Sequence, residues 1–251
     1  MIRQILASAM LAGLVAGAFA SVTQQTYLLP VLLEAERYES GEVTHFGTAP
    51  AAPAADAPAA HDHAEAVAPH SHAAPADDGG LAMRFGLTLL SQLVTFVGFG
   101  LLLVAGFALA ARAGHEITAR SGILWGLAGF AALQLLPAAG LAPELPGSAG
   151  AALAARQAWW LFAVLASAAG LAALAFGRGP ALAALGVLLL AAPHIVGAPH
   201  PAAYSGVAPP ELAALFSARG LATGAAAWAV LGLAAGHFWA RERRALAPQP
   251  A

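Results

Sequence analysis

Apolar residues occur in long runs along this chain, and most polar residues are confined to short breaks between the runs. A helix needs roughly 20 apolar residues to cross about 30 Å of hydrocarbon, and six runs reach or approach that length. The pattern therefore predicts an all-α, polytopic bundle of transmembrane helices with about six spans. The expected spans cover residues 5–29, 85–111, 123–141, 157–176, 180–198 and 211–239.

One polar stretch, at residues 34–83, is long enough to form a segment of its own. It is acidic at first and then becomes an Ala/Pro tract that contains four histidines. Such a composition cannot bury a core, so we expect a disordered His-rich outer loop. The chain then divides into a first transmembrane helix (1–33), this loop (34–83), a five-helix membrane bundle (84–241) and a short tail (242–251).

The first apolar run has two interpretations. Ala18-Phe19-Ala20 before Ser21 resembles the cleavage site of a signal peptide. We favour a retained helix, because apolar character resumes at Tyr27-Leu28-Leu29. Gly13 and Gly17 give this helix the four-residue spacing of small residues that allows close helix packing.

The composition excludes several classes of protein. Hydrophobic residues make up 59% of the 251 residues and charged residues only 10%, against about 25% charged in soluble domains. The chain contains no cysteine, which excludes disulfides and thiolate metal sites. It also contains no lysine, so it cannot hold a P-loop ATPase site.

The arginines predict the orientation of the chain, because cytoplasmic loops carry an excess of basic residues. With the N-terminus inside, seven arginines face the cytoplasm, and only Arg37, Arg84 and Arg156 lie outside. Both termini are then cytoplasmic, and the His-rich loop is periplasmic or extracellular.

That loop carries the clearest candidate for metal binding. Four of its histidines form two His-x-His pairs within twelve residues: His61, His63, His70 and His72. Imidazoles on a flexible chain can converge on one nickel, cobalt, copper or zinc ion. The alternative is a solvated linker without a function.

A second candidate lies where the fifth span ends, between Pro193 and Pro201. Its prolines and Gly197 prevent a regular helix, and irregular backbone at membrane depth must be buried in protein or reached by water. His194 and His200 lie in this broken segment and are candidate metal ligands. The alternative is a helix cap with two interfacial histidines.

Arg219 is the third candidate. It lies eight residues after Glu211, so about 12 Å below the outer end of the sixth span. An intramembrane arginine costs about 3 kcal/mol on insertion scales, which favours a paired residue that faces the bundle. Gln92 or Gln134 could be its partner, and snorkelling to the interface is the alternative.

Four segments together resemble one family. They are 30–39 after the first span, 143–147 before the fourth, 156–160 at its start, and 193–201 at the end of the fifth. In this order the chain resembles the CbtA family, the membrane subunit of a predicted bacterial cobalt transporter. The resemblance implies cobalt uptake linked to cobalamin synthesis in the inner membrane. It also implies a small single-span partner, CbtB, that carries histidines of its own.

All four segments fall on the outer side of the predicted topology. We therefore expect one mouth there, with Arg219 beneath it and no permanently bound cofactor; cobalt(II) or a similar divalent metal would be the transported or captured ion. The residues expected around this mouth are Glu34, Glu36, Glu39, Glu144, Arg156, His194 and His200.

Two other functions remain open. One is a membrane-anchored metal-binding or sensing scaffold that transports nothing. The other is an intramembrane metalloenzyme that uses His194 and His200, which we disfavour because such enzymes need three or more ligands. We expect no enzymatic activity and no nucleic-acid partner.

Overall fold

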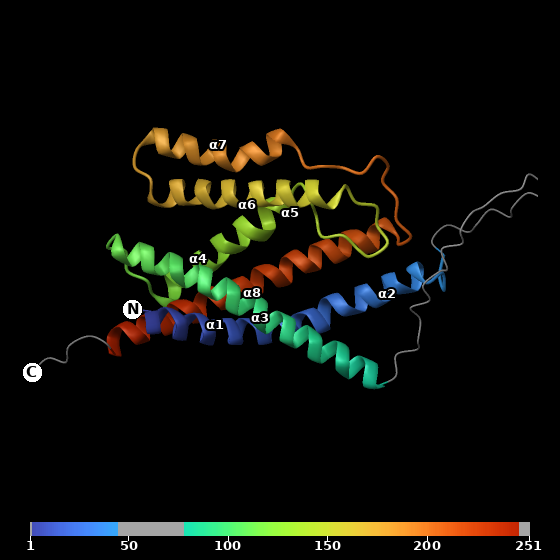
Figure 1. Cartoon of the computed structure of the whole chain (residues 1–251), viewed down its shortest axis with the longest axis horizontal. Helices are drawn as coiled ribbons and strands as arrows, with labels where there is room; N and C mark the ends of the chain where they lie inside the picture. Colours follow the sequence, from blue (N-terminus) through green and yellow to red (C-terminus); the bar gives the residue numbers. More distant parts are fainter. Residues whose placement is uncertain (1, 45–77, 246–251) are drawn as a thin grey trace, which may run out of the picture.

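The computed structural model describes residues 2–44 and 78–245, and every regular element in these ranges is a helix (Figure 1). The elements are α1 (Ile2–Thr23), the π-helix η1 (Gln24–Leu28), α2 (Leu29–Glu39), α3 (Asp78–Arg112), α4 (Ala119–Phe130), the π-helix η2 (Ala131–Leu135), α5 (Leu136–Ala138), α6 (Leu153–Phe176), α7 (Pro180–Val196) and α8 (Pro210–Ala245). The expected all-α class is confirmed.

Five helical segments of the described chain are long and apolar enough to cross a membrane: Ile2–Glu39, Ala82–Arg112, Ala119–Ala138, Leu153–Phe176 and Pro210–Ala245. The helix α7 is apolar but has only 17 residues, about 25 Å, so the segment after it must complete that crossing. The helix α1 begins and the helix α8 ends at the same end of the bundle (Figure 1). We call this the termini end, and we call the opposite end, which carries residues 40–44, 139–152 and 197–209, the loop end.

The first helix is longer than expected. α1, η1 and α2 follow one another without a break from Ile2 to Glu39, so residues 34–39 are helical and do not belong to the loop expected to begin at 34. Pro30 is tolerated because it lies at the start of α2, directly after the π-helix. Arg37 pairs with Glu34 one turn earlier, and this pair stabilises a helical turn that the acidic composition did not predict.

Small residues allow the central helices to pack at backbone distance. α1 packs against α3 and α8, and α4 packs against α8. A Cβ added to Gly13 would lie 2.5 Å from the Cα of Val97, and one added to Gly126 would collide with the carbonyl oxygen of Trp228. The small-residue spacing therefore serves packing, as expected.

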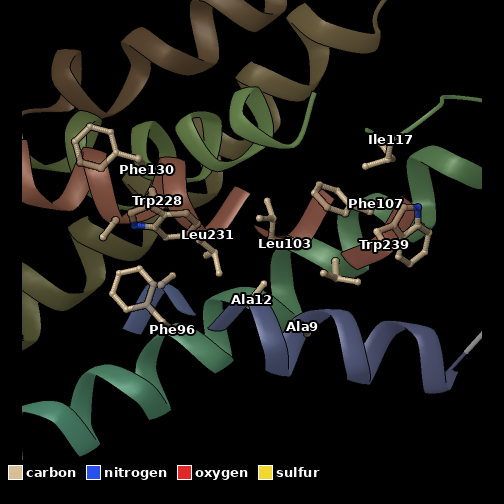
Figure 2. Close-up of a cluster of buried hydrophobic side chains, with 14 of the residues drawn as sticks. Ala9, Ala12, Phe96, Leu103, Phe107, Ile117, Phe130, Trp228, Leu231 and Trp239 are labelled. Carbon is tan, nitrogen blue, oxygen red and sulfur yellow. The ribbon is translucent and has the colours of Figure 1, made fainter. Parts of the chain in front are cut away.

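Aromatic side chains fill the core between these helices (Figure 2). The ring of Phe107 lies 5.5 Å from that of Trp125 and 6.2 Å from that of Trp239, both edge to face. Nearer the loop end of α8, the ring of Trp228 lies 4.7 Å from that of Phe99. This core joins α1, α3, α4 and α8, whereas α6 and α7 form a hairpin at the side of the bundle (Figure 1).

The close packing predicts a sharp difference between two glycines. Gly126→Ala should lower the free energy of unfolding by about 1–3 kcal/mol, because its methyl group has no space against α8. Gly98→Ala is the control, because a Cβ there meets no atom within 4 Å. Alanine has the higher helix propensity, so the free energy of unfolding should stay equal or rise by up to about 1 kcal/mol. Titration with SDS in detergent micelles measures both, and equal losses would contradict the packing described.

Candidate functional site at the loop end

The end of α7 is fixed to α6 through one backbone carbonyl. Pro193 is buried inside the last turn of α7, and the helix ends at Gly197, which has a φ of 84°. The carbonyl oxygen of Pro193 accepts the N–H of Gly197 at 3.0 Å and the indole N–H of Trp159 at 3.2 Å. Trp159, at the start of α6, is 6% exposed, so the helix break is held by a buried side chain.

The two expected metal ligands lie on either side of this break. The ring of His194 lies 6.2 Å from that of Trp159, and the Nδ1 of His200 lies 2.9 Å from the hydroxyl of Tyr204. Both histidines are exposed. Within residues 2–44 and 78–245, no three histidine, aspartate or glutamate side chains come close enough together to hold a metal ion. The two imidazoles are therefore at most part of a coordination site in this chain.

Most of the expected acidic mouth is neutralised by arginine. Each arginine of the loop end binds a glutamate: Arg37 to Glu34 at 2.9 Å, Arg84 to Glu36 at 2.7 Å, and Arg156 to Glu144 at 2.8 Å. Arg84 links α3 to α2, and Arg156 links α6 to the 139–152 loop. These exposed pairs contribute little stability, and they engage three of the four glutamates expected at the mouth.

Glu39 differs from these glutamates. It lies at the last position of α2, close to Gly147 and Val207: a Cβ added to Gly147 would be 3.8 Å from the Cγ of Glu39 and 3.0 Å from a methyl group of Val207. The same two loops are joined by the bond from the Ala149 N–H to the Ser205 carbonyl, at 2.8 Å. Glu39 thus lies beside the 139–152 loop, which is hydrogen-bonded to the loop that carries His200.

Arg219 is bound by a backbone group of the first helix. Its Nη1 donates to the carbonyl oxygen of Tyr27, in η1, at 3.1 Å. The expected amide partners are engaged elsewhere, since Gln92 donates to the side chain of Gln24 and Gln134 lies against Gly224. The side chain is half-buried and turned toward the first helix, which agrees with a paired arginine.

Sequence reasoning missed the two π-helices. Each is followed directly by a Leu-Pro pair, Leu29-Pro30 and Leu136-Pro137, and this repeated pattern was the available signal. Proline supplies no N–H, so the turn before it loses one donor, and π-helical turns are frequent at functional sites.

The helix α8 contacts both π-helices. Gly220 approaches Leu28 of η1, and Gly224 packs against the side-chain oxygen of Gln134 in η2. Between them, the Thr223 hydroxyl bonds back to the carbonyl of Arg219 at 2.8 Å. The stretch from Arg219 to Gly224 therefore binds a carbonyl of η1 and packs against a side chain of η2.

The remaining candidates, His61, His63, His70 and His72, lie outside the described residues. Their role in metal capture stays a prediction.

The fold defines a multi-pass helical membrane protein whose irregular helix ends gather polar groups toward one end. The chain belongs to the CbtA family: the family model described as "Probable cobalt transporter subunit (CbtA)" matches residues 2–240. The resemblance is confirmed over nearly the whole chain, and the family indicates a transporter subunit that works with a partner component. No curated protein and no solved structure matches the chain.

The bond between Arg219 and Tyr27 predicts a specific loss. Arg219→Ala should lower the free energy of unfolding by about 1–2 kcal/mol, because a charged donor to a backbone carbonyl of the first helix is lost. Arg219→Lys should recover part of that loss, since a point charge cannot reproduce the planar guanidinium. Arg178→Ala, at an exposed arginine of the termini end, is the control. If the Arg219→Ala protein were as stable as the control, the bond to Tyr27 would not matter and Arg219 would be a residue that snorkels to the interface.

Proposed function

We propose that this protein is the membrane subunit of a cobalt uptake system that supplies cobalamin synthesis. The observation that carries the proposal is the match to the cobalt transporter subunit family over residues 2–240. The broken end of α7, with two exposed imidazoles, supports it, because imidazole is a natural ligand of divalent transition metals.

The proposed site of action is the bacterial inner membrane, with both termini in the cytoplasm. The arginines support this orientation. Seven arginines, Arg241, Arg243 and Arg244 among them, lie at the termini end, against three at the loop end. The positive-inside rule then places the loop end outside.

We propose two successive roles for the histidines. The quartet at 61–72 raises the metal concentration near the membrane, and His194 and His200 receive the ion as it loses water. Glu39 is the best placed glutamate to assist them, because it lies beside the loop that precedes α6, and that loop is hydrogen-bonded to the loop that carries His200. Its carboxylate would supply an oxygen ligand of the kind divalent metals accept.

A partner subunit completes the proposal. A closed site takes four ligands, and within the described residues no three histidine, aspartate or glutamate side chains come close enough together to hold a metal ion. A small single-span, CbtB-like subunit with its own histidines would supply the missing ligands.

A membrane-anchored metal scaffold without transport activity is the second candidate. The exposure of His194 and His200 favours it to some extent, because transport sites are usually enclosed. Only a transporter gives net flux into the cell, so uptake measurements separate the two functions.

The two histidine roles predict different kinetic defects. Replacing His61, His63, His70 and His72 by Ala should raise the cobalt concentration needed for half-maximal uptake and leave the maximal rate unchanged. His194→Ala should lower the maximal rate by about tenfold, the size of effect seen when the surroundings of a metal ligand are disturbed. Whole-cell uptake of radiolabelled cobalt, measured against metal concentration, distinguishes the two.

His237→Ala, near the termini end of α8, is the control and should match the wild type. A quartet variant that lost its maximal rate, together with a His194→Ala protein that kept its own, would reverse the two roles. An absence of cobalt flux in cells that express the wild-type chain and its partner would favour the scaffold.

A further inference from the structure

An apolar cavity of about 460 Å³ lies among α3, α4 and α6. Phe99, Trp125, Ala172, Phe176 and Trp228 are among the residues that line it, and no charged side chain does. Such a lining offers nothing to a metal ion, so this cavity has no part in the site at the loop end.

The cavity exists because the α6–α7 hairpin touches the core at its two ends. At the loop end, α6 contacts η2 and α5. At the termini end, the ring of Phe176 lies 5.8 Å from Trp125 and 5.2 Å from His115. Between these contacts α6 turns small side chains such as Ala168 and Ala172 toward the gap. In a membrane, the medium beside this gap is lipid.

A second, polar cavity of about 490 Å³ lies at the termini end. Its lining carries two arginines and a histidine against one glutamate: Arg243, Arg244, His115 and Glu116. Arginine side chains suit phosphate, because their donors match its oxygens. The cavity therefore has the charge expected for an anionic headgroup.

The two cavities are neighbours. Ser121 lines the apolar cavity and Thr118 lines the polar one, and these residues cap the same helix through reciprocal bonds of 2.8 Å and 3.2 Å. In addition, His115 of the polar cavity contacts Phe176 of the apolar one. One molecule with an apolar chain and a charged head could occupy both.

We propose that this pair of cavities binds one anionic phospholipid from the leaflet at the termini end. One acyl chain fills the apolar cavity and holds the α6–α7 hairpin to the core, while the phosphate lies against Arg243 and Arg244. A partner helix, about 10 Å across, does not fit between the contacts that close the cavity at both ends.

The acyl chain can be detected through Trp228. Trp228 is 2% exposed but lines the cavity, whereas Trp239 on the same helix is 1% exposed and does not. In reconstituted protein that retains only Trp228, phosphatidylglycerol brominated in mid-chain should quench the fluorescence. Ala172→Phe should remove most of this quenching by filling the cavity. Ala169→Phe, at an exposed alanine of α6 that does not line the cavity, should leave it unchanged.

The headgroup is tested by lipid class. Brominated phosphatidylglycerol should quench Trp228 more than brominated phosphatidylcholine, and the double change Arg243→Gln and Arg244→Gln should abolish the difference. Since removal of four tryptophans could impair folding, native mass spectrometry of bound phosphatidylglycerol on chains with all tryptophans gives a second measurement. Equal quenching or equal lipid retention in the Ala172→Phe and Ala169→Phe proteins would overturn the proposal. Loss of a copurifying subunit from the Ala172→Phe protein alone would do the same.

Discussion

Backbone polar groups inside a membrane must find partners within the protein, and this constraint governs the loop end of the bundle. The three passes that run toward that end are all interrupted by proline, at Pro30, Pro137 and Pro193. Near each interruption a side chain of α6 or α8 donates to a carbonyl. Arg219 donates to Tyr27, Ser217 to Pro143 and Trp159 to Pro193. Two of the three helices that run the other way, α6 and α8, thus stabilise the ends of these three passes.

This arrangement joins stability to the proposed function. The irregular ends place imidazole and carboxylate groups at the same end of the bundle, and the donors from α6 and α8 fix those ends relative to the core. Salt bridges such as Arg156–Glu144 join the loops to the helices and engage glutamates of this end. Among the described residues, Glu39, His194 and His200 are the main candidates to hold a metal ion that arrives there.

The sequence predicted what depends on local pattern. The run lengths indicated the helices and their order, and the glycine spacing indicated close packing. Pro193 and Gly197 indicated the broken end of α7. Features that depend on neighbours in space could not be predicted: nothing in the chain near Arg219 points to the carbonyl of Tyr27, 192 residues away. Likewise, Glu34 and Glu39 look equivalent in sequence. Only the fold shows that Glu34 binds Arg37, whereas Glu39 lies beside Gly147 of the 139–152 loop.

The central claim is that a donor from a neighbouring helix holds each broken end in its working position. Trp159→Phe tests it most directly, because the ring is kept and only the N–H to Pro193 is lost. Trp160→Phe, at the adjacent, 42% exposed tryptophan, is the matched control. With both proteins present in the membrane in equal amounts, maximal cobalt uptake should fall several-fold in the Trp159→Phe protein and stay at the wild-type rate in the control. Wild-type uptake by the Trp159→Phe protein would contradict the account.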